Sequence, residues 1–72
     1  MQEKASVINV AKRIGLEEFE TLCNVADIAI LQDGYNIDNR LTFADGVHKY
    51  WSIVSLDELV EIFIYRLWAN HK

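Results

Sequence analysis

Cysteine, histidine and tyrosine are the first candidates for catalytic chemistry in this 72-residue sequence. Cys23 could act as a nucleophile, and His48 with Tyr50 could act as a general base and acid. Cys23 falls on the apolar face of a predicted helix, where a thiol behaves as a small hydrophobic group. No neighbouring residue would orient His48 and Tyr50 for proton transfer, and the sequence has no glycine-rich phosphate loop. We therefore predict no catalytic site and expect a protein that is not an enzyme.

Possible metal ligands are equally sparse. His48 and His71 have no cysteine or carboxylate at the spacing that a zinc site needs. The segment DGYNIDNRLTFADG, residues 33–46, is rich in oxygen ligands, but an EF-hand loop requires acids at its first, third and fifth positions. Either possible start places a tyrosine or an arginine where an acid is needed. The sequence predicts neither a metal nor a cofactor, and it gives no sign of a small-molecule substrate.

The composition, with 51% hydrophobic and 25% charged residues, is typical of a folded globular chain. We expect one compact domain over residues 1–72. A chain this short buries only about 60% of its unfolded surface. The single cysteine, Cys23, allows no internal disulfide, and it fits a reducing compartment. A partner protein or a second copy is then the expected source of additional stability.

The charge and hydropathy patterns exclude several classes of partner. The net charge of −4 disfavours nonspecific binding to nucleic acid or anionic lipid. The first fifteen residues contain four charged residues and no apolar core, unlike a secretory signal. The most apolar run is LVEIFIYRLW at residues 59–68, and it is far shorter than the apolar stretch that a membrane span needs. We expect a soluble cytoplasmic protein that binds no membrane, with nucleic acid an unfavoured partner.

Two helices are predicted in the N-terminal half, over about residues 3–14 and about residues 17–31. Gly15 and Gly34 follow their last turns and can end them. The segment 27–32 could instead form a strand, since short apolar runs are ambiguous. In each segment the apolar residues recur at the spacing of one side of a helix. The first helix contains Val7, Val10, Ala11 and Ile14 at this spacing, and the second contains Phe19, Leu22, Cys23, Ala26 and Ile30.

The next segment changes to an alternating pattern. Asp45 and Gly46 separate two such runs, which is the strongest short signal for a β-hairpin. A two-residue turn there gives a hairpin over about residues 40–53, and residues 35–37 could add a third short strand. Because side chains alternate between the faces of a strand, the expected core-facing set is Leu41, Phe43, His48 and Tyr50. The predicted fold class is therefore α+β, in the order α-α-β-β-α.

The last predicted helix covers about residues 56–70. Ser55 and Glu58 match a capping box at its start. Its core-facing side contains Leu56, Leu59, Val60, Phe63 and Leu67. Ile62, Tyr65 and Ala69 lie on the opposite side and Trp68 at the edge, a wider apolar arc than one core usually needs. Three explanations remain open: a central helix covered on two sides, a homodimer interface, or a site for another protein.

The predicted second helix also carries an acidic stripe, formed by Glu17, Glu20, Asn24 and Asp27, opposite its apolar face. This stripe could be an ordinary solvated face, or it could bind a basic surface of a partner. The same region could form a helix-turn-helix-like corner for DNA. In that alternative the contacts would come from a hairpin wing and from Lys12, Arg13, Arg40 and Lys49. The acidic residues that follow the corner would repel phosphates.

These patterns together favour a small acidic interaction domain that regulates or inhibits a partner by occupying its surface. The expected partner-binding residues come from both surfaces and are Ile62, Tyr65, Trp68, Ala69, Glu17, Glu20 and Asp27. By analogy, small acidic proteins of this kind are often encoded by bacteriophage or mobile elements. The alternative is a nucleic-acid-binding transcriptional regulator with a helix-turn-helix-like corner and a hairpin wing.

Overall fold

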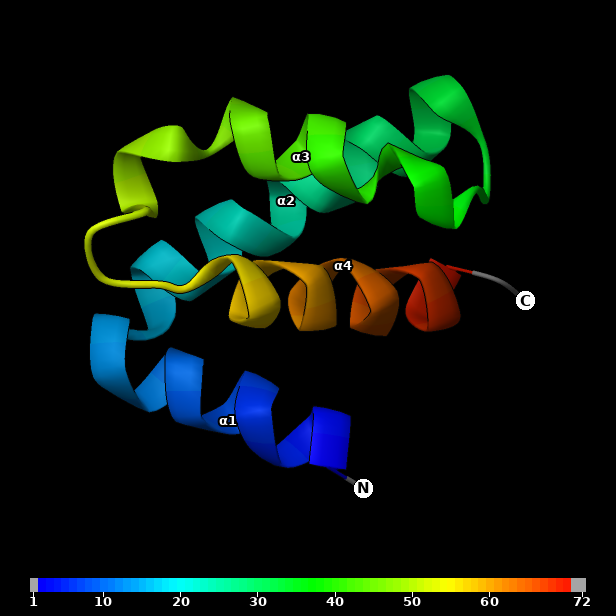
Figure 1. The fold of residues 1–72 in the computed structure, drawn as a ribbon. Helices are drawn as coiled ribbons and strands as arrows, with labels where there is room; N and C mark the ends of the chain where they lie inside the picture. The colour runs from blue at the N-terminus through cyan, green and yellow to red at the C-terminus, as the bar shows by residue number, and fades with distance from the viewer. Residues whose placement is uncertain (1, 71–72) are drawn as a thin grey trace.

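A computed structural model describes the backbone of residues 2–70 and the side chains of residues 6–70, and this part of the chain is helical (Figure 1). The elements in chain order are α1 (Gln2–Ile14), α2 (Leu16–Asp33), η1 (Ile37–Asn39), α3 (Arg40–Gly46), η2 (His48–Tyr50) and α4 (Leu56–Asn70). The two η segments are single 3₁₀ turns. No strand occurs between residues 2 and 70, so the predicted α+β fold class is wrong.

Three of the predicted elements are present with nearly the predicted bounds. Helices α1, α2 and α4 correspond to the predicted segments 3–14, 17–31 and 56–70. The ambiguous segment 27–32 is helical, because the helical period of buried residues continues through Leu22, Ala26 and Ile30. Periodic burial therefore predicts these helices correctly.

Two glycines form the ends of α2. Gly15 has φ 95° and ψ 154°, and Gly34 has φ 88° and ψ 176°. This region of backbone space is essentially restricted to glycine. The Gly34 amide donates to the Ile30 carbonyl at 2.7 Å. This bond satisfies one of the carbonyls that the last turn of a helix leaves without an intrahelical partner. Each glycine allows a sharp change of chain direction within one residue.

The predicted hairpin over residues 40–53 is wrong, and so is the short strand over residues 35–37. The first segment forms α3, η2 and a turn, and the second leads into η1. A type I′ turn needs positive φ at both central residues, but Gly46 has no positive φ. The buried positions follow helical spacing instead, at Phe43, Val47 and Tyr50. Leu41, which the hairpin would have buried, is exposed.

Replacing Gly46 with alanine tests this correction directly. A methyl group at this position would meet open space. We expect the free energy of unfolding to rise by up to about 0.8 kcal/mol, because glycine is a poor helix former. A hairpin turn would give the opposite sign. Gly15→Ala is the matched control and should lower the free energy of unfolding by about 1–3 kcal/mol through backbone strain. Urea denaturation followed by circular dichroism measures both changes, and a destabilised Gly46→Ala would contradict the helical assignment.

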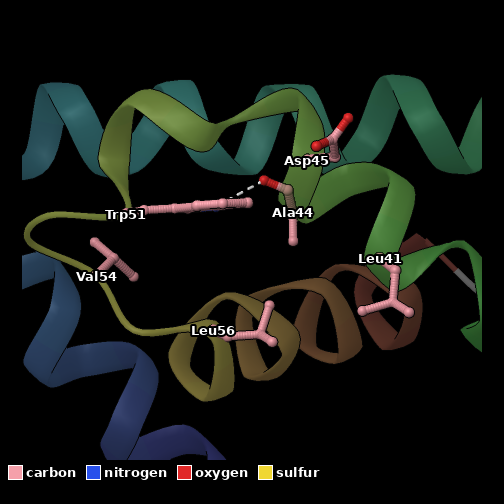
Figure 2. A pocket seen from close by; sticks show the side chains of 6 residues that line it. All are labelled: Leu41, Ala44, Asp45, Trp51, Val54 and Leu56. Atoms are coloured by element: carbon pink, nitrogen blue, oxygen red, sulfur yellow. Dashed lines mark hydrogen bonds between the residues drawn. The ribbon is translucent and has the colours of Figure 1, made fainter.

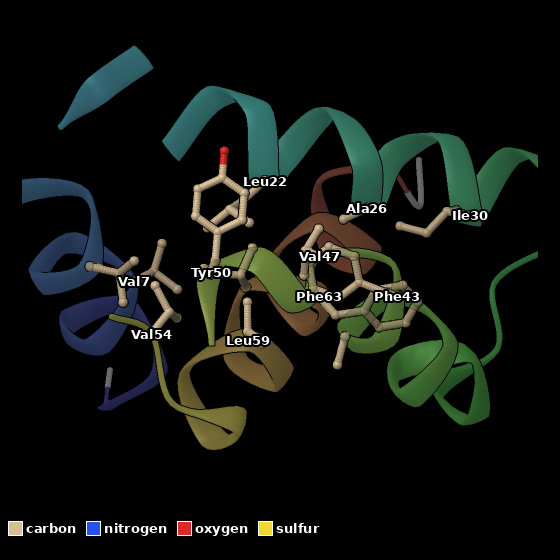
Figure 3. Close-up of a cluster of buried hydrophobic side chains, with 13 residues drawn as sticks. Val7, Leu22, Ala26, Ile30, Phe43, Val47, Tyr50, Val54, Leu59 and Phe63 are labelled. Carbon is tan, nitrogen blue, oxygen red and sulfur yellow. The ribbon is translucent and has the colours of Figure 1, made fainter. Parts of the chain in front are cut away.

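Helix α4 lies between α1 on one side and α2 with α3 on the other, and it contacts all three (Figure 1). Figure 3 shows the buried side chains that these helices share. The rings of Phe43 and Phe63 stack within this cluster, with centroids 5.5 Å apart. The core residues are Val7, Val10, Leu22, Ala26, Ile30, Phe43, Ala44, Val47, Tyr50, Val54, Leu59, Ile62 and Phe63.

The predicted capping box at the start of α4 is confirmed. The Glu58 amide donates to Ser55 Oγ at 3.1 Å, and the Ser55 amide donates to Glu58 Oε1 at 3.0 Å. Arg13 of α1 extends this arrangement, because its Nη2 donates to Glu58 Oε1 at 2.6 Å and its Nε donates to the Ile53 carbonyl at 3.1 Å. The cap therefore also fixes the end of α1 against α4.

These contacts predict a pH dependence of stability. The Arg13 guanidinium, with help from Ser55, lowers the pKa of Glu58 below its ordinary value of 4.5, because both groups favour the charged carboxylate. A lowered pKa in the folded state stabilises the protein above the unfolded value, and this stabilisation is lost as the pH falls through the folded pKa. Glu58→Gln keeps a capping-box residue but removes the charge. We expect it to lower the free energy of unfolding by about 0.5–1 kcal/mol at pH 7.

The check is urea denaturation of the wild type and Glu58→Gln over a series of pH values from neutral to strongly acidic. The difference between them should begin to shrink as the pH falls below the ordinary glutamate pKa of 4.5. It should approach zero only below the lowered pKa of the folded state, where the carboxylate is protonated in both states. Two curves that stay parallel over the whole range would show that Glu58 contributes no charge-dependent stability.

Candidate functional site

The four partner-binding residues predicted on the last helix do not form one surface. Ile62 is completely buried in the core, so it cannot contact a partner. The central position of α4 explains this burial, because neighbouring helices cover a wider arc than the sequence pattern assumed. Tyr65 is 38% exposed and Trp68 is 78% exposed. Ala69 is half-buried. Of these four residues only Tyr65 and Trp68 are exposed, and Leu56, which was expected in the core, is exposed as well.

The acidic stripe also divides into two parts. Glu17 and Glu20 are exposed. Asp27 instead joins α2 to α4: its carboxylate accepts from Arg66 Nε at 2.8 Å and Nη2 at 3.1 Å, and from the Asn70 side-chain amide at 2.8 Å. The hydrogen bond to Asp27 raises the pKa of Arg66 above its usual value. Asp27 therefore holds the helices together, in addition to contributing negative charge.

A hollow between α2 and α4 brings together residues from both predicted surfaces. Its volume is about 450 Å³, and Glu20, Asp27 and Tyr65 are among its lining residues. The remaining lining residues are Leu16, Phe19, Cys23, Asn24 and Arg66. In this hollow residues of the acidic stripe lie beside a residue of the last helix that was predicted to bind a partner.

Cys23, His48 and Tyr50, the three residues considered for catalysis, have different surroundings. Burial raises the pKa of the Cys23 thiol, an effect that the nearby Arg66 opposes. The Tyr50 hydroxyl donates to Glu18 Oε1 at 2.5 Å, and this bond raises the pKa of Tyr50. His48 is exposed, and its ring lies edge-on to Trp51, with centroids 6.3 Å apart. His48 and Tyr50 thus face different surroundings, unlike their predicted shared strand face.

Trp68 lies beside a second hollow, near the C-terminal end of α4. Tyr35, Ile37 and Leu67 line this hollow with it, and the volume is about 540 Å³. The Tyr35 hydroxyl donates to the Asn70 carbonyl and so holds the segment before η1 against α4. Trp68 and Tyr65 therefore face different hollows, although only three positions separate them in the sequence.

A third hollow, the α3–α4 groove, was not predicted from the sequence (Figure 2). Its volume is about 390 Å³. The exposed fractions of Leu41, Trp51 and Leu56 are 56%, 53% and 51%. The Trp51 indole N–H donates to the Ala44 carbonyl at 3.0 Å, which fixes the ring at the edge of the groove. The lining residues are Leu41, Ala44, Asp45, Trp51, Val54 and Leu56.

The sequence contained one signal that could have indicated this groove. Phe43, Val47, Tyr50 and Val54 recur at the spacing of one helix face, and all four are buried. Assigning that face to the core leaves Leu41 and Trp51 outside it. The hairpin was predicted instead because Asp45 and Gly46 are typical turn residues. That hairpin would have placed Leu41 in the core.

The cations predicted for DNA contact lie largely in intramolecular interactions. Arg13 pairs with Glu58, and Arg40 donates to the Ile37 carbonyl at 2.9 Å. Lys49 Nζ lies 5.3 Å from the centroid of the Tyr50 ring. Lys12 is exposed. The hairpin wing of the nucleic-acid alternative is wrong, since α3 and η2 occupy that segment.

Residues 6–70 form a small helical fold, and exposed aromatic and aliphatic side chains border the hollows described above. In the described part of the chain, no helix combines the length and apolar character needed to cross a bilayer. Comparison with protein-family models, curated proteins and solved structures finds no match.

Proposed function

We propose that this protein is a non-enzymatic interaction domain that regulates or inhibits another protein by occupying its surface. The observation that carries the proposal is the number of exposed apolar side chains. Within residues 6–70, twelve large hydrophobic side chains are exposed, including two tryptophans and two tyrosines. Large exposed apolar patches on small proteins mark interaction sites. Tryptophan and tyrosine dominate the energetics of such sites.

The grouping of these side chains also supports the proposal. Leu41, Trp51 and Leu56 border the α3–α4 groove, and Tyr35 with Trp68 borders the second hollow. Scattered single apolar residues need no explanation, whereas groups around a concave surface can accept side chains of a partner. The protein would act by covering a surface of its target, which requires no reaction.

Several polar groups that could support catalysis have structural roles instead. Asp27 binds Arg66 and Asn70 across α2 and α4. Glu58 belongs to the cap of α4. Burial raises the pKa of Cys23, which disfavours its reactive thiolate form. These roles favour an interaction domain over an enzyme.

Affinity capture from a lysate of the native source tests the proposal. The bait proteins are the wild type, Leu41→Lys in the α3–α4 groove, Trp68→Lys in the second hollow, and the control Leu31→Lys. Leu31 is exposed on α2 and lines none of the three hollows. We expect one specific protein with the wild type and the control, and its loss with at least one hollow variant.

The captured protein is then purified and its affinity for each bait is measured by calorimetry. The proposal is supported if the purified protein binds the baits that captured it and binds the other baits more weakly. Recovery of the same proteins with all four baits, or no binding by the purified candidate, contradicts it. Sedimentation equilibrium reveals a second copy as the partner, in which case Leu41→Lys or Trp68→Lys should dissociate the dimer.

A further inference from the structure

We infer that α1 can leave its own α4 and pack on the α4 of a second copy, so that two chains form a dimer by exchanging their first helices. Gly15 is the hinge for this exchange. The inference concerns self-association and does not depend on the proposed function. Three features lead to it: the conformation of Gly15, the hydrogen bonds that already run past it, and the charges on its two sides.

The junction between α1 and α2 is a single residue in a glycine-only conformation. Helix α1 ends at Ile14, α2 begins at Leu16, and the chain reverses its direction between them (Figure 1). Gly15 makes this reversal with φ 95° and ψ 154°, and no side-chain hydrogen bond caps the start of α2. Such a short and constrained hinge favours exchange of an element between copies, because the exchange releases the bend.

The backbone is already close to a continuous helix at this junction. The Gly15 amide donates to the Ala11 carbonyl and the Phe19 amide donates to the Gly15 carbonyl, each at 3.0 Å. Both bonds have the spacing of an α-helix, and the sequence contains no proline to interrupt one. If Gly15 became helical, the amides of residues 16–18 would donate to the carbonyls of residues 12–14. A straight helix would thus satisfy backbone groups that two helix ends leave unpaired.

A straight helix would carry α1 away from its own α4. The two helices are in contact, and the buried side chains Val7 and Val10 belong to the common core, so their exposure to water would be unfavourable. The α1 of a second copy meets the same surface of α4. It restores the lost contacts, including the ion pair of Arg13 with Glu58. In a two-fold dimer each copy fills the surface that the other has vacated.

The charges on the two sides of the hinge suit this dimer. Exchange makes the two straight helices run in opposite directions, so that they pass each other near Gly15. The basic residues before the hinge of one copy then lie beside the acidic residues after the hinge of the other, as the segment KRIGLEE of residues 12–18 requires. Lys12 and Glu17 have no ion-pair partner among the described side chains, and Leu16 is 69% exposed. The crossing pairs these charges and covers Leu16.

The exchanged dimer would present the other surfaces in duplicate. Residues outside α1 line the α3–α4 groove and the second hollow. Leu41→Lys and Trp68→Lys should therefore leave this dimer intact. That result would distinguish it from a dimer in which the hollows themselves contact a second copy, and it keeps this test separate from the test of the proposed function.

Refolding of the full chain at millimolar concentration, followed by sedimentation equilibrium, tests the inference. The linkage to α2 keeps α1 at a high effective concentration, so we expect a monomer in dilute solution and a dimer after concentrated refolding. Gly15→Ala should strengthen dimerisation at least about tenfold, because alanine is strained in the bend and favoured in a straight helix. Gly34→Ala is the matched control. It has a similar conformation, with φ 88°, at the other end of α2, and it should dimerise no more strongly than the wild type.

Leu16→Pro provides the opposite test. Leu16 is the first residue of α2, a position that accepts proline, and the extended ψ of Gly15 suits a residue before proline. Inside a straight helix the same proline would lack its amide donor and clash with the Lys12 carbonyl. We expect Leu16→Pro to stay monomeric where the wild type dimerises, and to cancel the effect of Gly15→Ala in the double variant.

Isotope-filtered nuclear Overhauser spectra of dimers made from labelled and unlabelled chains identify the exchanged element. Contacts between the methyl groups of α1 and those of α4 should join different copies. The inference is overturned by contacts confined to one copy, by a wild type that stays monomeric after concentrated refolding, or by equal dimerisation of the two glycine variants. A Leu16→Pro dimer as strong as that of the wild type also contradicts it. If Gly15→Ala fails to fold, the wild type and Leu16→Pro still decide the question.

Discussion

Replacing Phe63 with alanine should leave a large fraction of the molecules unfolded without denaturant. Phe63 is completely buried, and its ring stacks on that of Phe43, another core residue. Truncating a buried phenylalanine usually costs about 3–5 kcal/mol. Domains are stable by only about 5–15 kcal/mol, and small ones lie at the low end of that range. This loss therefore approaches the whole stability of the fold.

Urea denaturation followed by far-ultraviolet circular dichroism measures the effect. Tyr65→Ala is the control on the same helix, since Tyr65 is partly exposed and its truncation should cost less than about 1 kcal/mol. If Phe63→Ala and Tyr65→Ala had similar unfolding midpoints, α4 would not have the orientation described. The comparison also separates the core face of α4 from its partly exposed face.

Asp27→Ala should lower the free energy of unfolding by about 2–3 kcal/mol. The substitution removes the acceptor of three hydrogen bonds and leaves Arg66 and Asn70 without their partner. The Arg66 and Asp27 side chains are only 22% and 26% exposed, so water replaces the lost bonds incompletely. Thermal and urea denaturation at neutral pH give the value.

Glu20→Ala is the matched control for Asp27. Both residues are acids on α2 that line the hollow between α2 and α4, but Glu20 is exposed and forms no ion pair with another described residue. We expect Glu20→Ala to lower the free energy of unfolding by less than about 0.5 kcal/mol. Equal effects of the two substitutions would mean that Asp27 is part of a solvated acidic stripe and does not join the helices.

The sequence predicts the elements whose apolar period is long and regular. Val7, Val10 and Ile14 identify α1, and Ser55 with Glu58 identifies the first turn of α4. The segment of α3 is too short for its period to be distinctive, and the Asp45–Gly46 pair fits a turn as well as the end of a helix. Packing against α4 decided the outcome, because it buries Phe43 and Val47 at helical spacing.

The candidate site was less predictable than the helices. The positions of residues around the helix axis place Ile62 opposite the predicted core-facing side. They do not tell how many neighbouring helices cover α4. The structure buries Ile62 and leaves Tyr65 exposed. The α3–α4 groove depends on where Leu41 and Trp51 lie relative to Leu56, which is a property of tertiary packing. Local patterns contain no information about such distances.

The contacts of α4 with all three other helices affect how the chain folds during its synthesis. The ribosome makes α4 after the other three, so Val10, Leu22 and Phe43 have no complete cover while it is still being translated. A nascent chain in this state exposes apolar surface that chaperones bind and proteases attack. Compaction should therefore occur as one late event, once α4 leaves the exit tunnel. A ribosome stalled before Leu56 would hold three helices without the element that contacts all of them.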